Sequence, residues 1–160
     1  MSCGPFVTVP FSAAVRDCTG GNPKVQRKDY LSEGDLPVID QGQEFIAGFT
    51  DAKNVYCGKL PGVVSGDHTR TLKYVDFPFA LGADGVKVLE PLEGFDAAFL
   101  CLYFRSVNLP SAGYSRHFKF LKELAVPKPT LPEQHRLVDI LSRAEGIVRL
   151  RREAEKKAAE

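Results

Sequence analysis

Two short stretches of the chain concentrate residue types that suit contacts with nucleic acid. The first runs from Gly66 to Tyr74 and the second from Gly113 to Lys119. Both combine glycine, cations, hydroxyls and aromatic rings, which can contact phosphates and base edges in a groove. A glutamine pair flanking a glycine could also read adenine. The predicted DNA-contacting residues are His68, Thr69, Arg70, Lys73, Tyr74, Tyr114, Ser115, Arg116, His117, Lys119, Gln41 and Gln43.

The same residues leave an enzymatic interpretation open. Asp67, His68 and Arg70 could serve a small stand-alone nuclease. Adjacent residues on a strand point to opposite faces, however, which opposes an acid/base pair made by Asp67 and His68. The sequence holds no H-E-x-x-H motif, nucleophile elbow or phosphate loop, so metal or hydrolytic chemistry has no support. Taken singly, Asp67 is expected to bond its own backbone in a turn, and His68 and His117 to be partly buried.

Composition describes a single domain with a real core. The chain has 160 residues, of which 44% are hydrophobic, and a net charge of +1. Residues 1–104 carry nine Lys and Arg against thirteen Asp and Glu, a net −4, whereas residues 105–160 carry twelve against seven, a net +5. We expect a soluble, cytoplasmic protein because no window could span a bilayer and no secretory pattern begins the chain. Reduced, mostly buried thiols are expected at Cys3, Cys18, Cys57 and Cys101.

A long helix is predicted from residue 130 to the end. Thr130 and Glu133 have the spacing of a capping box, with Pro132 in the first turn. Such a helix would extend roughly 42 Å, too far for a domain of this size to bury. We expect the part from Leu137 to Val148 to pack on its own domain and the remainder to meet another helix. The heptad-spaced residues predicted to pair are Leu137, Ile140, Leu141, Ala144, Ile147, Val148, Arg151 and Ala154.

The region before this helix predicts an α+β fold with a curved mixed or antiparallel sheet and a few helices. Short strands without intervening helices are punctuated by glycine. Strands are expected at 37–40, 45–46, 55–56, 63–65, 72–77 and 86–89. Ser12 should cap a brief helix through Arg16, and Asp96 a buried one from Ala97 to Val107. The predicted organisation is a compact unit over 1–129 and a protruding coiled-coil type helix over 130–160.

The sequence resembles the specificity subunits of type I restriction–modification systems. The run from Val126 to Ala154 is similar to the segment that follows a target-recognition domain in that family, with a proline-flanked strand, L-x-E-Q, and a helix with a basic continuation. The motif residues are Val126, Pro127, Pro129, Leu131, Glu133, Gln134, Leu137, Val138, Ile140 and Leu141. Upstream stretches and the early Gly-Gly-x-Pro turn also match, so the resemblance extends from Phe11 to Ala154.

This resemblance implies a non-catalytic DNA-binding subunit that reads one half of a bipartite target. Its helix would pair with a second helix as a spacer, and modification (methyltransferase) subunits and often a motor-nuclease subunit would dock around it. No cofactor is implied for the chain itself, because S-adenosylmethionine belongs to the modification subunit. Family members carry two recognition domains and two helices, so one of each implies a half-subunit or fragment that pairs with a copy of itself or another half. A module that only binds modification subunits remains an alternative.

Overall fold

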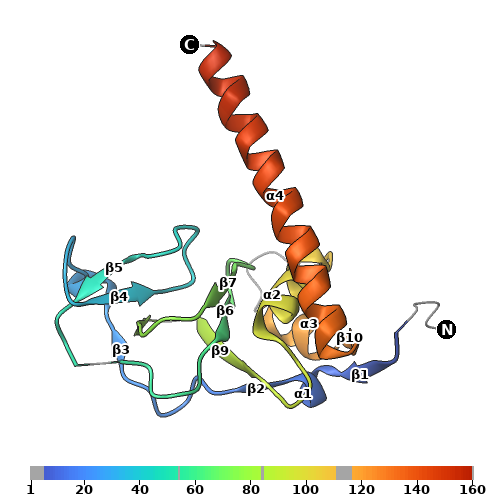
Figure 1. Ribbon diagram of the computed structural model, residues 1–160. Coiled ribbons are helices and arrows are strands. Elements are labelled where there is room, and N and C mark those ends of the chain that lie inside the picture. The colour runs from blue at the N-terminus through green and yellow to red at the C-terminus, as the bar shows by residue number, and fades with distance from the viewer. Residues whose placement is uncertain (1–5, 54, 84, 111–116, 160) are drawn as a thin grey trace.

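Short strands of mixed direction curl beside a helical layer, and one long helix leaves that layer (Figure 1). The computed structural model describes residues 6–53, 55–83, 85–110 and 117–159. Its helical elements are α1 (Phe11–Ala14), the 3-10 turn η1 (Arg27–Asp29), α2 (Ala97–Ser106), α3 (Phe118–Lys122) and α4 (Leu131–Ala159). Its strands are β1 (Thr8–Pro10), β2 (Val15–Asp17), β3 (Lys24–Val25), β4 (Leu36–Ile39), β5 (Gly48–Thr50), β6 (Gly62–Gly66), β7 (Leu72–Val75), β8 (Ala80–Gly82), β9 (Val86–Pro91) and β10 (Ala125–Pro127).

The strands form small sheets rather than one large one. An antiparallel sheet has the order β2-β9-β6-β7, and a mixed sheet has the order β3-β8-β4-β5, in which β8 runs parallel to both neighbours. A further pair joins β1 to β10, so the first strand lies against the segment that leads into α4. The predicted α+β class with a curved mixed and antiparallel sheet is confirmed.

The main core lies between the antiparallel sheet and α2. Leu100 and Phe104 of α2 are buried with Val63 and Leu89 of the sheet. The carboxylate of Asp96 caps α2 by accepting from the backbone N–H of Phe99 at 2.9 Å. The predicted cap is confirmed, and it satisfies a donor that the helix cannot satisfy itself.

A buried carboxylate ties the far end of this sheet together. Glu90 of β9 accepts hydrogen bonds from the Tyr56 hydroxyl and the Lys59 backbone N–H, both at 2.8 Å, and from the Arg16 guanidinium at 3.1 Å. Burial opposes ionisation of Glu90, but these hydrogen bonds outweigh it and hold its pKa below the ordinary value.

One buried amide fixes the base of α4. Gln134 is fully buried, and its Nε2 donates to the carbonyl oxygens of Gly94 at 2.8 Å and Pro129 at 2.9 Å. Its Oε1 accepts from the backbone N–H of Asp96 at 2.8 Å, so one side chain joins the start of α4 to the start of α2. In the capping box predicted at the start of α4, the carboxylate of Glu133 accepts from the backbone N–H of Thr130 at 2.8 Å, as expected.

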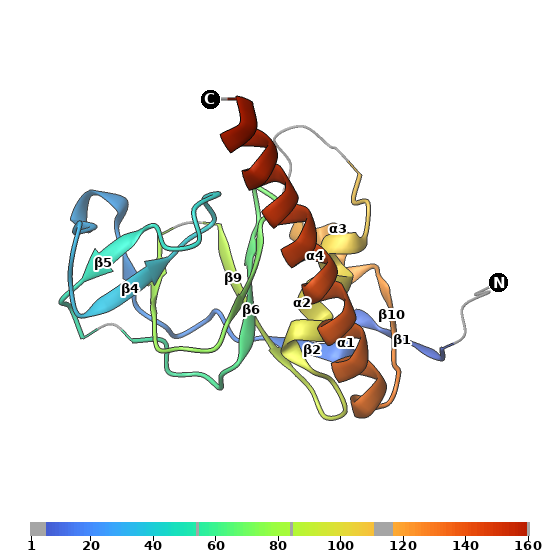
Figure 2. The same cartoon turned by 45° about the horizontal axis from the view of Figure 1, so that its top comes forward.

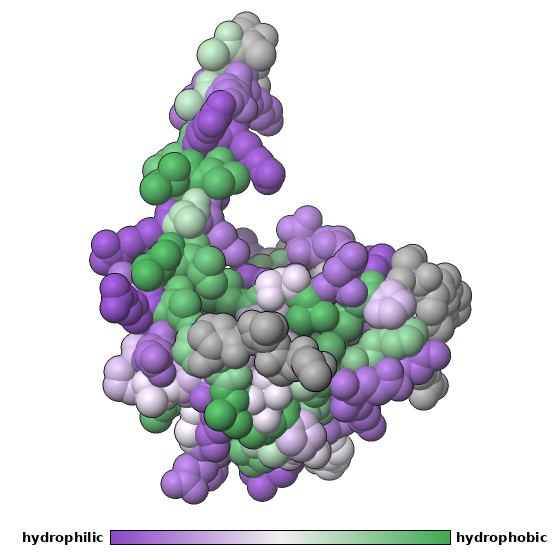
Figure 3. All heavy atoms as spheres, turned by 90° about the vertical axis from the view of Figure 1, so that its right-hand side faces the viewer, coloured by the Kyte–Doolittle hydropathy of each residue, from purple (hydrophilic) through white to green (hydrophobic). Residues whose placement is uncertain are grey.

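Beyond its first turns α4 leaves the domain. Leu137 and Val138 are half-buried against the core, whereas Ile140, Ile147 and Val148 are 52%, 68% and 49% exposed. Packing on the domain therefore ends earlier than the predicted limit at Val148. Figure 3 shows apolar surface along the projecting helix. No helix that the structure describes is both long enough and apolar enough to cross a membrane.

Several local predictions were wrong. The helix expected to be capped by Ser12 and to run through Arg16 instead begins at Phe11 and ends at Ala14, because Val15–Asp17 pairs with β9. Residues 45–46 form no strand but lie in the loop between β4 and β5, and residues 55–56 provide only a single bridge, from Val55 to Ala80. Among the described cysteines, only Cys101 is buried, whereas Cys18 is half-buried and Cys57 exposed.

Candidate nucleic-acid interface

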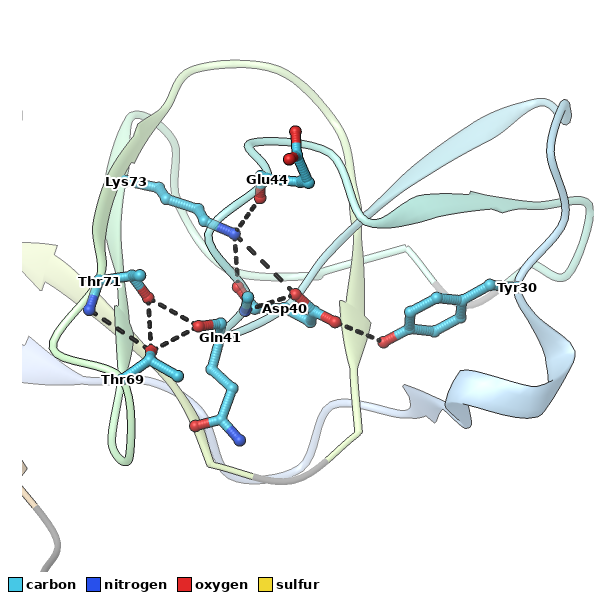
Figure 4. A network of polar contacts seen from close by, with 8 residues as sticks. Tyr30, Asp40, Gln41, Glu44, Thr69, Thr71 and Lys73 are labelled. Carbon is cyan, nitrogen blue, oxygen red and sulfur yellow. Dashed lines mark hydrogen bonds and ion pairs between the residues drawn. The ribbon is translucent and has the colours of Figure 1, made fainter. Parts of the chain in front are cut away.

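Segments from distant parts of the sequence meet at one edge of the domain, and Figure 4 shows the hydrogen bonds that join two of them through Gln41. They are the β4–β5 loop (residues 40–47), the β6–β7 turn (residues 67–71) and the start of α3. Figures 1 and 2 show the first two on the side toward which α4 extends. The structure therefore brings together the described parts of the three stretches predicted to contact DNA. Tyr114, Ser115 and Arg116 lie outside the described residues.

The β6–β7 turn is closed by its own backbone and hydroxyls. The N–H of Gly66 donates to the carbonyl of Thr71 at 2.8 Å, and the hydroxyls of Thr69 and Thr71 lie 2.9 Å apart. A Cβ at Gly66 would overlap both hydroxyls, so this close approach requires glycine. The turn leaves His68 and Arg70 exposed at its tip.

Gln41 holds this turn from the neighbouring loop. Its backbone carbonyl accepts from both the Thr69 hydroxyl and the Thr71 hydroxyl, the latter at 2.9 Å. Its side-chain Oε1 accepts from the backbone N–H of His68 at 3.2 Å. Because that oxygen is engaged within the protein, Gln41 positions the turn, and Gln43 is the glutamine with an exposed side chain.

A buried cation holds the β4–β5 loop against β7. The Lys73 ammonium is 4% exposed and donates to the carbonyl oxygens of Asp40 at 2.8 Å and Glu44 at 2.6 Å. Burial lowers the pKa of Lys73, while the charges of Asp40 and Glu44 act in the opposite direction. Asp40 also accepts from the Tyr30 hydroxyl at 3.3 Å, and burial raises the pKa of Tyr30 to about 12. Lys73 thus fixes the conformation of the β4–β5 loop from a buried position.

Asp67 attaches the start of α3 to the same turn. Its carboxylate accepts from the backbone N–H of Phe118 at 3.0 Å, and its carbonyl accepts from the N–H of His117 at 2.8 Å. Asp67 therefore bonds a segment far away in the sequence, in addition to any bond within its own turn. His117 is buried, and its Nδ1 has no hydrogen-bond partner among the described residues.

The remaining candidates differ in their surroundings. Arg70 has a φ of 57°, a left-handed conformation that is uncommon for residues other than glycine, and its Nη1 lies 3.4 Å from the carbonyl oxygen of Leu109. Lys119 is exposed, with its ammonium 4.8 Å from the centre of the Phe120 ring. Tyr74 is half-buried and packs toward the core under α2, so it does not join the turns.

The helix residues predicted to pair lie along α4. Leu137 packs on the domain, whereas Leu141, Ala144 and Val148 are exposed and line an open groove between α2 and α4. Ile140, Ile147, Arg151 and Ala154 are exposed as well. Leu150, which the heptad pattern leaves out, is also exposed, at 61%.

Comparison with known proteins finds likeness in both sequence and fold. No protein-family model matches the chain. The specificity subunit of the type I restriction enzyme EcoR124I/EcoR124II from Escherichia coli is 27% identical over 124 residues, which cover 69% of this chain and 30% of that protein. The chain superposes on the HsdS subunit from Thermoanaerobacter tengcongensis with a TM-score of 0.60, at 18% identity, covering 94% of this chain and 39% of the other. The resemblance to type I specificity subunits is confirmed.

Two further solved structures share the fold of these specificity subunits. The type I S subunit from M. genitalium gives a TM-score of 0.62 at 16% identity, covering 91% of this chain and 40% of the other. A chain from a structure that describes complex assembly and conformational transition of a type I R-M system gives a TM-score of 0.70 at 19% identity. The match covers 99% of this chain and 43% of the other. The chain thus spans about a third of the curated specificity subunit and about two fifths of the solved ones.

Sequence reasoning missed several residues that build this edge. Lys73 was predicted to contact DNA, but nothing local in the sequence marks its ammonium as buried. Phe45 and Ile46 were assigned to a strand, yet they are exposed by 44% and 38% in the β4–β5 loop. The glycine and glutamines just before them are typical of a loop and could have indicated this.

Among the described residues, no three His, Cys, Asp or Glu side chains gather where a metal ion could bind.

Proposed function

We propose that this chain is a sequence-reading, non-catalytic DNA-binding module of the type I specificity-subunit kind. It directs modification subunits, and with them a motor-nuclease subunit, to one half of a bipartite target in cytoplasmic DNA. The observation that carries the proposal is that the β4–β5 loop, the β6–β7 turn and the start of α3 are joined by hydrogen bonds at one edge of the domain. The comparisons support it through the names and fold of the similar proteins.

The chemistry of the edge suits a duplex. Its exposed side chains include the guanidinium of Arg70, the imidazole of His68, the amide of Gln43 and the ammonium of Lys119. Guanidinium and amide groups match the donor and acceptor pattern of base edges in the major groove, while cations contact phosphates. Hydrogen bonds within the protein fix the turns that carry these groups, which lowers the conformational entropy lost on binding.

We further propose that the two parts have different roles. Residues 1–129 read DNA, and residues 130–160 form a spacer helix that pairs with the helix of a second copy or of another half-subunit. Two identical halves related by a two-fold axis would require a palindromic, interrupted target, because the symmetry of the site mirrors that of the protein. S-adenosylmethionine would bind to the modification subunit and not to this chain.

Selection from randomised duplex DNA tests the proposal. The full chain is mixed with a type I modification subunit, and bound duplexes are sequenced at fixed salt. We expect enrichment of a short fixed sequence, and Arg70→Ala should weaken binding to it or change it. Lys128→Ala is the matched control, because Lys128 is exposed and follows β10, which pairs with β1 outside the two sheets that carry the turns.

The alternatives give different outcomes. If the selection enriches no sequence, the proposed sequence-specific DNA binding is wrong. If the chain then still co-purifies with the modification subunit, a module that only binds that subunit is favoured. Magnesium-dependent cleavage of DNA by the purified chain would favour the nuclease alternative instead.

A further inference from the structure

The β4–β5 loop exposes an apolar pair at the proposed interface. Phe45 is 44% exposed and Ile46 is 38% exposed, while the preceding Gln43 and Glu44 are polar and also exposed. Exposing two neighbouring large apolar side chains at a loop tip is unfavourable in water, and such exposure often marks a binding surface. The polar contacts of the proposed interface leave this pair without a role.

The loop that carries this pair is held firmly. Lys73 bonds to the carbonyls of Asp40 and Glu44, so a single ammonium joins both ends of the segment that leads to Phe45. The ring of Phe45 rests edge-on against that of Phe77, with 6.0 Å between centroids and an interplanar angle of 67°. One face of the aromatic side chain is therefore supported by protein while the rest meets solvent.

The loop extends the proposed interface along β7. Gln41 contacts Thr69 and Thr71 just before β7, and Phe45 contacts Phe77 just after it. A strand advances roughly 3.4 Å per residue, and the base pairs of a duplex are spaced by the same distance. The edge from the β6–β7 turn to Phe45 is thus long enough to face several base pairs.

We propose that Phe45 and Ile46 determine specificity by contacting the 5-methyl group of a thymine in the major groove. This inference rests on the proposed DNA-reading function. Among the unmodified bases, thymine alone presents a methyl group in that groove, and apolar side chains are its usual partners. Neither side chain of the pair can hydrogen-bond, so the pair adds to the edge a preference that His68, Arg70 and Gln43 cannot supply. Burying the methyl group removes apolar surface of both molecules from water.

The test replaces thymine with uracil, which lacks only this methyl group. The selected duplex is made with uracil at each thymine in turn, and binding is measured for the full chain in its complex with the modification subunit. Wild-type affinity should fall about fourfold at one position, the size expected for one buried methyl group. Phe45→Ala should weaken binding to the thymine duplex by at least as much and be insensitive to uracil at that position.

A matched control separates this contact from general apolar loss. Val7→Ala truncates an apolar side chain that is 75% exposed near β1, away from the three turns, and should keep the full sensitivity to uracil. Equal sensitivity to uracil in wild type and Phe45→Ala would overturn the methyl contact, even though sequence selection survives. Binding that ignores uracil throughout but unstacks a neighbouring 2-aminopurine, seen as a rise in its fluorescence, would overturn it in favour of a side chain inserted between base pairs. Failure of wild type to select any sequence would instead overturn the underlying DNA-reading function.

Discussion

The carboxylate of Asp67 and the backbone N–H of Phe118 are joined by a 3.0 Å hydrogen bond across 51 positions of the sequence. The neighbouring bond from the His117 N–H to the Asp67 carbonyl, at 2.8 Å, reinforces it. Because the β6–β7 turn also contacts Gln41, Asp67 sits at the centre of the proposed interface without facing the solvent. The edge is thus assembled by buried polar groups, and its exposed groups are the ones that we propose contact DNA.

Asp67→Ala should therefore weaken both the fold and DNA binding. Removing the carboxylate leaves the buried N–H of Phe118 unsatisfied, which costs about 1–3 kcal/mol of unfolding free energy. Urea denaturation at pH 7 measures this. Asp67→Asn keeps an acceptor oxygen in place and should lose less. Equal losses in the two variants would show that charge, rather than the hydrogen bond to α3, determines the role of Asp67.

Replacing Arg70 with glycine should separate stability from function. Arg70 has a φ of 57°, where glycine is not strained, while the greater freedom of glycine in the unfolded chain acts in the opposite direction. We expect the unfolding free energy to change by less than about 1 kcal/mol, and binding to the selected duplex to weaken by about 1–3 kcal/mol. Circular dichroism during urea unfolding and fluorescence anisotropy of labelled DNA measure the two. A large loss of stability with unchanged affinity would contradict this.

Gln134→Leu should loosen the base of α4. The amide makes three hydrogen bonds at a fully buried position, and leucine has similar volume but would leave the carbonyls of Gly94 and Pro129 and the N–H of Asp96 unpaired. We expect a loss of about 2–5 kcal/mol in unfolding free energy. The exposed neighbour Arg136→Leu is the control and should change stability by less than about 0.5 kcal/mol.

Acid should destabilise the protein partly through Glu90. Its folded pKa is lower than the ordinary value of 4.5, so its stabilising contribution is complete above about pH 4.5. That contribution is lost as the pH falls through the folded pKa. Glu90→Gln should lower stability at pH 7, because the ion pair with Arg16 is lost, and should make the fall in stability between pH 5 and pH 3 shallower. Urea unfolding of both proteins across this range measures the difference, and parallel pH profiles would contradict it.

Charge placed on the exposed seam of α4 should prevent helix pairing. Ile147 lies on the heptad seam and is 68% exposed, whereas Leu150 is 61% exposed and lies off the seam. Light scattering should find a dimer for wild type and Leu150→Asp, and a monomer for Ile147→Asp. Both residues are already exposed, so neither variant should unfold the domain. Loss of the dimer in both variants would show that pairing does not follow the heptad seam.

The parts of the fold that sequence could predict are those determined by local pattern. The capping residues Asp96 and Glu133 and the extent of α4 each depend on a few neighbouring positions, and they appear as expected. Val15 and Arg16 were mispredicted as helix because their conformation depends on pairing with β9, more than 70 residues away. Tertiary pairing overrode a weak local preference there.

The candidate site was predictable in composition but not in arrangement. The stretches around His68 and His117 were identified by residue type, and the structure places their described parts in contact. The separate roles of the residues could not be read from the sequence, because a buried lysine such as Lys73 looks the same as an exposed one. Its acceptors are backbone carbonyls 29 and 33 positions away. Every residue has a backbone carbonyl, so the sequence gives no sign of which ones accept these hydrogen bonds.

Only the first turns of α4 are fixed to the domain, so a small rotation at its base would move its far end by a larger distance. The helix has 29 residues and is fixed by Gln134 and by half-buried side chains in its first turns. At 1.5 Å per residue it is roughly 43 Å long, so a tilt of about 5° at the base would move the far end by roughly 4 Å. That displacement is close to the spacing of one base pair in DNA. A small change in packing around Gln134 would therefore shift the far end of α4, relative to the proposed interface, by about the spacing of one base pair.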